Sequence, residues 1–401
     1  MSFNIALSGL DATNKQLDTI SHNIANAATY GFKGGRTEFA AVYNGLQPGG
    51  VEVAATSQNF DMNGPVSGTG RAMDLAINGN GFFITKDSSG QMLYTRSGVF
   101  HNDSDNFVVN NVGSRLQGYS VDANNNLMTG SSGDIQISTS SLAAKATTKL
   151  DFIANFDAKA EPIDPADPNS AFDAENPNTY HASYTSKVFD SLGNPHTVSQ
   201  YFTKTNENTW NINVLVDGAE PANGATKVVS FDSDGSLTTP LDSFDIAFTP
   251  AGADPVNMTV NLKGSTQFGA DFGVSTNNPD GYSSGELVGV RVEENGMVYA
   301  TYTNGQSQLQ GQVVLANFAN PQGLGTTSGT AWTQSFSSGA PVIGTPGTGT
   351  LGGLSPGALE GSNVDLTSEL VSLMTAQRNY QANAKTISTD DKLTQALFNA
   401  I

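Results

Sequence analysis

The sequence of 401 residues predicts an α+β multidomain protein, in which paired N- and C-terminal α-helices form an inner helical domain and nested all-β domains are inserted between them. Three observations support this prediction. Apolar residues recur every seven positions near both ends of the chain. Between about residue 71 and residue 320 the period changes to two, which is typical of half-buried strands. Stretches rich in Gly, Pro, Ser and Thr separate these segments.

The N-terminal segment has the repeat of a helix that packs on another helix. Two sets of residues recur at intervals of seven: Phe3, Leu10, Leu17 and Ile24, and at complementary positions Ala6, Thr13, Ile20 and Ala27. This spacing predicts a helix over residues 3–28 with one apolar stripe. Gly31 is expected to act as its C-terminal stop.

The C-terminal segment repeats this pattern. Its apolar stripe is made of residues seven apart and their neighbours: Leu366, Leu373, Tyr380 and Ile387, with Leu370 and Ala384 alongside. Asp365 is expected to cap the N-terminus of this helix, and Glu369 favours the positive end of the helix dipole. Because each end of the chain can bury one stripe, we expect the two helices to pair.

Amide side chains interrupt both stripes, at Asn23 and Asn26 in the first and at Gln377 and Asn383 around Tyr380 in the second. A buried amide fixes the register and the partner of a helix at a cost in stability. Amides on several faces favour a helix surrounded by copies of itself, whereas a purely intramolecular pair is the simpler alternative. An isolated pair this polar would be marginal, so we expect the ends to be disordered in a free monomer and to order on assembly.

The residues expected to pack the inner helices and to mediate polymerisation follow from these stripes. They are Leu10, Leu17, Ile20, Asn23, Ile24, Asn26, Leu366, Leu370, Leu373, Gln377, Tyr380, Asn383, Ala384 and Ile387. Asn23 and Asn26 are expected to provide register and neighbour contacts at the foot of the first helix.

The middle of the chain is predicted to be β-rich. Residues 74–85, 91–110 and 286–318 each read as strand, turn and strand, and Asn295–Gly296 is a strong hairpin signal. Two composition shifts, at residues 160–181 and 320–354, suggest boundaries, linkers or surface arms. The expected domains are 1–30 with 362–401 as the inner helices, 31–70 with 325–361 as a connector, 71–144 with 285–324 as a first β domain, and 145–284 as an outer β domain.

The sequence argues against catalysis and against a metal or cofactor site. It contains no cysteine, and its four histidines lack the spacing of a metal site. Residues 103–106 and 232–235 resemble calcium loops, but neither has the glutamate that an EF-hand needs, so Asx-rich turns are the better interpretation. We therefore expect a structural or interaction protein with no catalytic residue, cofactor or metal.

Charge and hydropathy exclude two classes of partner. The formal net charge of −19 argues against nucleic acid and against an anionic membrane surface, since both need clustered cations. No segment approaches the ~18 consecutive apolar residues of a membrane helix, so no membrane insertion is expected.

The first residues, MSFNIALSGLDATNK, lack the positively charged start of a Sec-type signal peptide. If the protein leaves the cytoplasm, we expect it to use another route.

Three blocks of the sequence carry a family signature. They are SGLDATNKQLDTISHNIANAATYGFK at 8–33, GRAMDLAINGNGFFIT at 70–85 and LEGSNVDLTSELVSLMTAQRNYQANAKTISTDDKL at 359–393. Their content and order resemble the bacterial flagellar axial proteins, the family of rod, hook and hook-associated proteins, although His22 stands where the family pattern usually has asparagine. Rod members are shorter, whereas the insertion at 145–284 and the segment 287–324 resemble the hook members.

This resemblance implies a subunit that polymerises with itself into the flagellar hook, a curved tube that acts as a universal joint between rod and filament. It also implies an extracellular position, unfolded export through the type III export apparatus, and contacts with the rod, the hook cap and the hook-associated junction proteins. A distal flagellar rod protein is the first alternative. A secreted β-rich adhesin or hydrolase is a distant one, and the heptads at both termini weigh against it.

Overall fold

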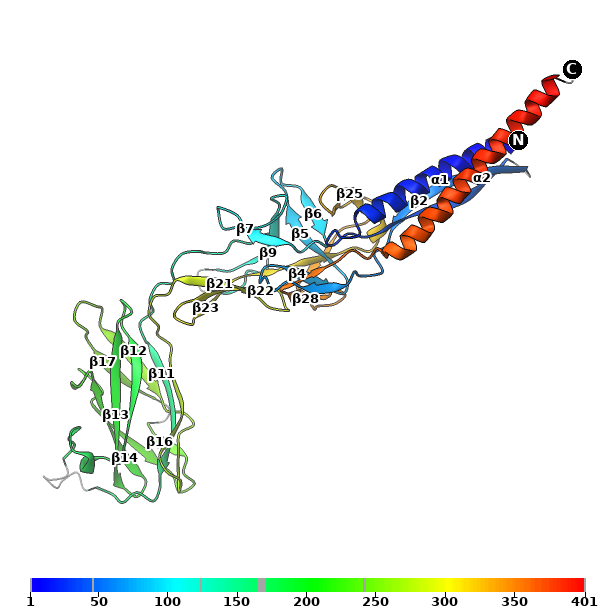
Figure 1. Cartoon of the computed structure of the whole chain (residues 1–401). Helices are drawn as coiled ribbons and strands as arrows, with labels where there is room; N and C mark the ends of the chain where they lie inside the picture. The colour runs from blue at the N-terminus through cyan, green and yellow to red at the C-terminus, as the bar shows by residue number, and fades with distance from the viewer. Residues whose placement is uncertain (1, 45–46, 123–124, 164–170, 241–242, 400–401) are drawn as a thin grey trace. The chain divides into compact units, whose positions relative to one another are not determined.

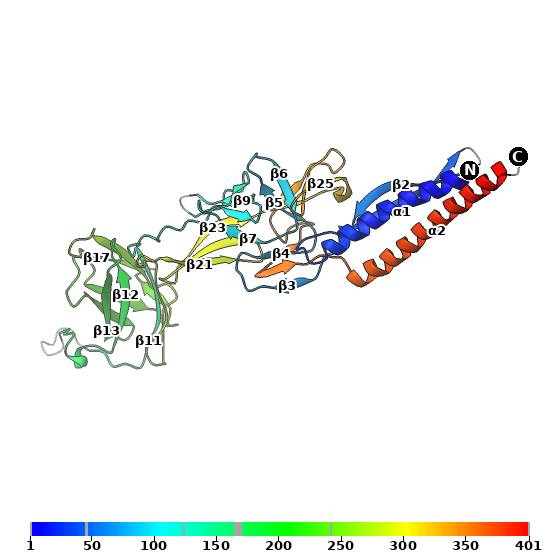
Figure 2. The same cartoon turned by 45° about the horizontal axis from the view of Figure 1, so that its top comes forward.

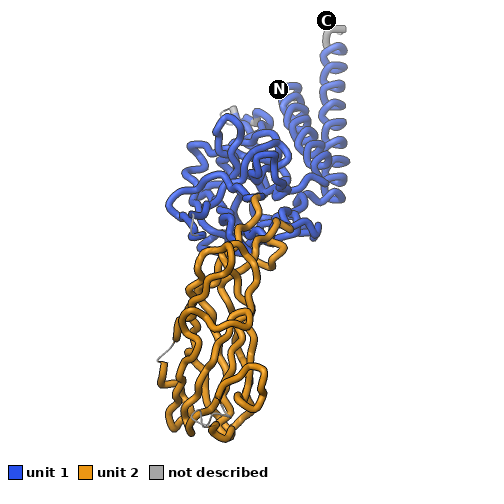
Figure 3. The backbone as a smooth tube through the Cα atoms, turned by 90° about the vertical axis from the view of Figure 1, so that its left-hand side faces the viewer, with its two compact units in different colours: residues 1–139, 289–301, 307–401 blue, residues 140–288, 302–306 orange. Residues whose placement is uncertain are grey.

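A computed structural model describes residues 2–44, 47–122, 125–163, 171–240 and 243–399 of the chain (Figure 1). The chain divides into two compact units, which Figure 3 distinguishes by colour. Unit 1 contains residues 1–139, 289–301 and 307–401, and unit 2 contains residues 140–288 and 302–306. Unit 2 is therefore an insertion in the sequence of unit 1, which holds both ends of the chain.

Two long helices of unit 1, α1 (Ser2–Ala25) and α2 (Leu366–Asn399), lie side by side (Figures 1 and 2). The predicted pairing of the chain ends is thus confirmed. Asp365 caps α2 as predicted, because its Oδ1 accepts hydrogen bonds from the backbone N–H groups of Thr367 (2.8 Å) and Ser368 (3.3 Å). Helix α1 ends at Ala25, three residues before the predicted boundary at residue 28, and the chain continues in turns.

A hairpin of β1 (Gly35–Asn44) and β2 (Gln47–Gln58) lies along α1. The Oγ1 atoms of Thr19 in α1 and Thr37 in β1 are 2.8 Å apart, and the Oγ of Ser8 accepts a hydrogen bond of 3.2 Å from the backbone N–H of Val51 in β2. One face of this ribbon is thereby covered. Phe39 and Tyr43 of β1 are 43% and 66% exposed.

The rest of unit 1 is an antiparallel β region. Its strands are β3 (Val66–Gly68), β4 (Leu75–Asn78), β5 (Phe82–Lys86), β6 (Met92–Thr95), β7 (Phe100–Asn102), β8 (Val108–Asn110), β9 (Arg115–Ser120), β10 (Gly133–Asp134), β21 (Leu287–Val292), β22 (Met297–Tyr302), β23 (Ser307–Val313), β24 (Leu315–Asn317), β25 (Gly325–Thr327), β26 (Ala331–Thr333), β27 (Val342–Gly344), β28 (Gly353–Pro356) and β29 (Ala358–Glu360). The unit boundary falls within β21 and at the end of β22.

The main sheet of this region follows the order β21-β22-β23-β9-β5-β6-β26-β25, with further strands branching from it. Strands β21 and β22 form the hairpin that Asn295–Gly296 predicts, and Gly296 has a positive φ of 84°. Strand β4 pairs with β28 and β3 pairs with β29, so residues from early and late in the sequence build the same layers. The core is formed by apolar side chains that are 0% exposed, such as those of Phe83, Phe100 and Leu315.

The expected connector contains more regular structure than its composition indicates. Residues 31–70 include the β1–β2 hairpin, and residues 325–361 include β25 and β26, which extend the main sheet through the pairing of Trp332 with Tyr94. The interpretation of residues 320–354 as a boundary, linker or surface arm did not foresee these two strands. Strands of three residues among Gly, Ser and Thr are too short to show a period of two. The division of the chain into four parts stays a prediction.

Unit 2 is built from two sheets that share one core. One sheet has the order β17-β18-β11-β19 with β20 also on β11, and the other has the order β12-β13-β14-β15-β16. The strands are β11 (Lys149–Asp157), β12 (Ala182–Phe189), β13 (Pro195–Asn206), β14 (Thr209–Val216), β15 (Thr226–Phe231), β16 (Leu237–Thr239), β17 (Ser243–Phe248), β18 (Val256–Asn261), β19 (Thr266–Phe268) and β20 (Gly273–Pro279). The composition shift at residues 160–181 lies inside this unit, and its residues 164–170 are outside the described part of the chain.

Aromatic side chains fill the core of unit 2. Strand β11 alternates strictly, so that Phe152 and Phe156 point inward while their neighbours are only half-buried. The ring centroid of Phe156 lies 5.3 Å from those of Phe202 and Trp210, which belong to the opposite sheet. Fully buried contacts of this kind give the unit its own core and explain why it separates as a compact unit.

A histidine bridges two carboxylates at one end of this sandwich. The Nδ1 of His196 lies 2.6 Å from Asp217 Oδ2, and its Nε2 lies 3.4 Å from Asp190 Oδ2. Burial alone would lower the pKa of His196, but its hydrogen bonds and ion pairs with Asp217 and Asp190 outweigh burial and raise that pKa above 6.5. Burial opposes ionisation of Asp190, but hydrogen bonds from Asn194 and His196 lower its pKa to about 2.

The stability of unit 2 should therefore depend on pH in both directions. The contribution of His196 is complete below its ordinary pKa of 6.5 and is lost as the pH rises through the raised value of the folded state. The contribution of Asp190 is complete above its ordinary pKa of 3.8 and is lost as the pH falls towards about 2. Thermal unfolding should show the highest melting temperature between these limits.

Fluorescence of Trp210 in the full chain with Trp332→Phe measures this profile for unit 2 alone. His196→Gln should remove the decline on the alkaline side, whereas His101→Gln, which changes an exposed histidine of unit 1, should leave the profile unchanged. An alkaline decline of equal size in the His196→Gln variant would contradict the assignment.

Candidate assembly interface

Small and polar side chains form the contact between α1 and α2. A Cβ built on Gly9 of α1 would lie 2.8 Å from the Nδ2 of Asn383 in α2, so this glycine allows the two helices to approach closely. Ala376 of α2 is 0% exposed, and Ala6 of α1 is 3% exposed. The face of α2 that carries the buried Ala376 also carries Asn383 and the half-buried Leu373 and Ile387.

Asn23 joins three segments from inside the fold. It is 2% exposed, and its Nδ2 donates hydrogen bonds to the backbone oxygen of Gly35 (2.8 Å) and to Glu369 Oε1 (2.9 Å). Its Oδ1 accepts a hydrogen bond of 2.8 Å from the N–H of Gly35. Asn23 thus ties α1 to the start of β1 and to the first turn of α2. These bonds agree with the expected role of Asn23 in the register of the helices, and its contact with a neighbouring subunit stays a prediction.

Asn26 shapes the turn that follows α1. Its Nδ2 donates to the backbone oxygen of His22 (3.0 Å), and its Oδ1 accepts from the hydroxyl of Thr29 (3.1 Å). This local use of the amide explains why the helix ends earlier than predicted. Gly31, the expected helix stop, has a different role: with a φ of 71°, it allows the turn to pack against the backbone of Arg96 and Ser97, where a Cβ would lie 2.3–2.5 Å from main-chain atoms.

The other predicted site residues divide into covered and uncovered positions. In α1, Ile20 is buried and Leu10, Leu17 and Ile24 are half-buried. In α2, the half-buried residues are Leu373, Asn383, Ala384 and Ile387. Gln377 is exposed, and Leu366, Leu370 and Tyr380 are 48%, 46% and 39% exposed. Leu366 and Leu370 are therefore not covered within the described chain, and their role in polymerisation stays a prediction.

The uncovered apolar residues of α2 form a continuous surface. We call Leu366, Leu370, Val371 and Met374 the exposed helix stripe; they are separated by one helical turn or less, and Val371 and Met374 are 60% and 57% exposed. Helix α1 adds Phe3, Ile5 and Leu7, which are 38–44% exposed. The sequence interpretation placed Phe3 in the first heptad but missed Val371, Met374, Ile5 and Leu7. The sequence does contain a signal for them. In each terminal helix, further apolar residues stand beside the heptad positions, and one partner helix cannot cover both sets.

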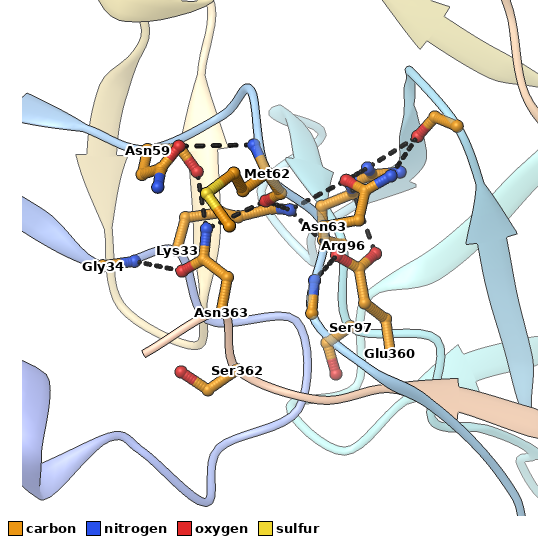
Figure 4. Close-up of polar contacts among 12 residues, drawn as sticks. Lys33, Gly34, Asn59, Met62, Asn63, Arg96, Ser97, Glu360, Ser362 and Asn363 are labelled. Carbon is orange, nitrogen blue, oxygen red and sulfur yellow. Dashed lines mark hydrogen bonds and ion pairs between the residues drawn. The ribbon is translucent and has the colours of Figure 1, made fainter. Parts of the chain in front are cut away.

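A buried ionic cluster lies where both helices meet the β region (Figure 4). The side chains of Lys33, Arg96 and Glu360 are at most 3% exposed. Lys33 Nζ donates to Glu360 Oε1 (2.8 Å) and to the backbone oxygen of Met62 (2.9 Å), and Arg96 Nε lies 3.4 Å from Glu360 Oε2. Burial first, and then the charge of Arg96, lower the pKa of Lys33, while Glu360 opposes this change. Burial also lowers the pKa of Arg96, again opposed by Glu360.

Asn363 closes the same junction from the other side. Its Oδ1 accepts from the N–H of Gly34 (2.8 Å), and its Nδ2 donates to the backbone oxygens of Asn59 (2.8 Å) and Met62 (2.9 Å) (Figure 4). The segment that leads into α2 is therefore bonded to the segment that follows α1 and to the end of β2. These contacts fix where the helix pair leaves the β region.

The carboxylate of Glu360 is the group on which this junction depends most. In Glu360→Gln, two buried cations would lose their only carboxylate among the described residues, and we expect a loss of about 3–5 kcal/mol in the free energy of unfolding of unit 1. Chemical denaturation followed by fluorescence of Trp332, with Trp210→Phe, measures this value.

The matched control for this substitution is Glu293→Gln. Glu293 Oε1 pairs with Arg291 Nη1 at 2.9 Å, but the two side chains are 33% and 56% exposed, so the change should stay within about 0.5 kcal/mol. If the two variants lose the same free energy of unfolding, burial of the Glu360 carboxylate does not stabilise unit 1 more than an exposed ion pair does, which would contradict the prediction.

Two kinds of feature are absent from the described residues. Within these residues, no group of three or more His, Cys, Asp and Glu side chains is placed to hold a metal ion. A search of the described helices finds none that is long and apolar enough to span a membrane. The hollows beside α1 are lined by polar side chains such as Thr19 and Asn23 together with apolar ones such as Ile20 and Phe32.

Family sequence models match four segments of the chain. The flagellar basal body rod protein model matches residues 3–33, and the D1 domain model of the flagellar hook proteins FlgE/F/G matches residues 76–150. The flagellar basal body protein FlaE D2 domain model matches residues 155–282, and the C-terminal model of the basal body rod proteins FlgEFG matches residues 355–400.

Full-length relatives agree with these matches. The chain is 40% identical to the flagellar hook protein FlgE of Escherichia coli K12 over 408 residues, which cover 100% of both chains. It is 31% identical to the flagellar hook protein FlgE of Rhizobium meliloti, over 98% of this chain and 97% of the relative. The crystal structure of Helicobacter pylori flagellar hook protein FlgE2 has a similar fold, with a TM-score of 0.54 and 14% identity over 72% of this chain and 98% of that one. The chain therefore belongs to the flagellar hook protein family.

Proposed function

We propose that this chain polymerises through its terminal helices into the curved tube of the bacterial flagellar hook, and that the tube transmits torque from rod to filament. Family membership makes the chain a structural hook subunit and not an enzyme. The observation that carries the proposed mode of assembly is the exposed helix stripe, since four large apolar side chains on one helix are left uncovered by the described part of the chain.

A second copy is the partner that fits these helices. The contact between α1 and α2 includes the small residue Gly9 and leaves Leu370, Val371 and Met374 of α2 exposed. A helix that is apolar on more than one side is stable in a bundle with further helices. We infer that α1 and α2 are incompletely ordered in a free monomer and become fully ordered when neighbouring copies cover the exposed helix stripe.

The acidic composition gives this assembly a dependence on salt. With a formal net charge of −19, copies of the chain repel one another at low ionic strength. Salt screens this repulsion, whereas the apolar contacts of the helices are not weakened by it. Added salt should therefore promote assembly.

Further partners follow from the family resemblance. We propose that the ends of the polymer contact the rod and the hook-associated junction proteins, that growth takes place beneath the hook cap, and that the subunit reaches its extracellular position through the type III export apparatus.

A distal rod protein is not favoured, since full-length relatives are hook proteins and the D2 domain model matches residues 155–282. A secreted adhesin or hydrolase has no support in the described residues.

The first test is the assembly of a variant in which the exposed helix stripe carries charge. Leu370→Asp together with Met374→Asp should raise the concentration needed for tube formation at least tenfold, because burying one large apolar side chain is worth about 1.5–3 kcal/mol. Negative-stain microscopy and sedimentation of the purified full-length chain in assembly-promoting salt measure this threshold.

The control is Thr386→Asp, which adds a charge at an exposed polar position of the same helix. It should assemble like the unsubstituted chain. Circular dichroism of the same samples should show more helix in tubes than in monomers. Tubes that form at the same threshold with the doubly charged variant would move the assembly interface away from the terminal helices.

A further inference from the structure

A single phenylalanine of unit 1 stands completely free of the chain. Phe336 follows β26, and its relative exposure is 104%, which is the highest value among the exposed large apolar residues of the described chain. Other large aromatic residues of this region, such as Trp332 and Tyr94, are at most 3% exposed. An apolar side chain of this size in water is unfavourable unless something covers it in the assembled state.

The turn that carries Phe336 is held in place by serine side chains. The Oγ of Ser335 accepts hydrogen bonds from the N–H groups of Ser337 (3.0 Å) and Ser338 (3.2 Å), and it donates to the backbone oxygen of Gly323. Ser338 is 0% exposed, and its Oγ donates to the backbone oxygen of Ser335 (2.9 Å). Asn320 Nδ2 donates to the backbone oxygen of Ser337 at 3.0 Å. Phe336 is therefore presented by an ordered turn, which lowers the entropy that docking would cost.

Unit 1 also contains an uncharged hollow of suitable size. Its volume is about 280 Å³, and its lining includes Ala28, Tyr30, Val99, Asn111, Val112 and Thr330. Tyr30 and Val112 are 43% and 66% exposed. We call it the Val112 hollow. None of its lining residues carries a carboxylate, an ammonium or a guanidinium group, whereas the two larger hollows of the described residues include Asp61, Glu369 and Asp18.

The absence of charge matters in a chain with a formal net charge of −19. Copies of this chain can approach most closely where neither surface carries a carboxylate. The turn at residues 335–338 and the Val112 hollow both meet this condition. They are also different surfaces of the same subunit, and a polymer that grows along a helix needs contacts between different surfaces, because a patch that binds itself closes into a dimer.

We propose that Phe336 of one subunit inserts into the Val112 hollow of a neighbouring subunit in the polymer. This inference rests on the proposed self-assembly and adds a contact outside the terminal helices. The contact is small and uncharged, so it can form and break at little cost. When a curved tube rotates, the spacing between its subunits changes. Lateral contacts that form and break easily allow this change.

Disulfide trapping tests the pairing directly, because the chain contains no cysteine of its own. The double variant Phe336→Cys with Val112→Cys should give a ladder of covalent oligomers when tubes are oxidised and then separated without reductant. Each single variant should give no ladder. The pair Phe336→Cys with Val342→Cys is the matched control, since Val342 is 64% exposed and does not line the hollow.

A second variant measures the energetic weight of the contact. Phe336→Ala should raise the concentration needed for tube formation about tenfold, and it leaves the fold intact because the side chain is fully exposed. Tubes that form without a ladder from the Phe336 and Val112 cysteines, or with an unchanged threshold for Phe336→Ala, would overturn the pairing and leave the proposed function standing. If the unsubstituted chain forms no tubes under any salt condition, the proposed function fails and this inference fails with it.

Discussion

The buried carboxylate of Glu360 is the constraint on which the arrangement of unit 1 depends. It lies between Lys33 and Arg96, and the three side chains come from segments that are far apart in the sequence. Its backbone oxygen also accepts a hydrogen bond of 2.8 Å from the N–H of Gly31. Two cations with one carboxylate are costly to bury, so the cluster persists only while all three segments stay in place. The helices α1 and α2 leave this point together, which makes their pairing a consequence of the junction.

The helix pair then leaves its large apolar residues for other partners. Gly9, Ala376 and Asn383 bring the helices close together, while Leu370 and Met374 stay exposed. A monomeric protein gains nothing from this arrangement, because the exposed residues lower its solubility. In the homopolymer that we propose, the next copy would cover the same residues. The net charge of −19 opposes premature association of the free chains, and the β regions outside the helices remain free to form weaker contacts.

The sequence predicted the elements well where periodicity extends over many residues. Both terminal helices, the cap at Asp365 and the hairpin at Asn295–Gly296 follow from local patterns, and the structure contains them. The family blocks predicted the hook family, which the full-length relatives confirm. The β-rich middle was also predicted, because strands such as β11 alternate over nine residues. Strands of three residues, such as β25 and β26, carry too little pattern to be found.

The site was harder to predict because a periodic pattern identifies an apolar stripe without identifying what covers it. Leu366 and Leu370 belong to the predicted stripe and are exposed, whereas Ala376 of the same helix is 0% exposed. Asn23 was recognised as unusual, but its partners Gly35 and Glu369 come from other segments. Lys33 and Glu360 were missed because their pairing spans 327 residues. Each of the two signature blocks that contain Lys33 and Glu360 carries several other charged residues, so no local pattern distinguishes this pair.

The measurement that tests this account most directly is an electron cryomicroscopy reconstruction of tubes assembled from the full-length chain. The account predicts that Leu370 and Met374 of every subunit are covered by helices of neighbouring copies in the inner wall of the tube. It also predicts that Asn23 keeps its bonds to Gly35 and Glu369 within one subunit. A tube in which Leu370 and Met374 remain exposed, while the β regions make all contacts between subunits, would contradict the central claim.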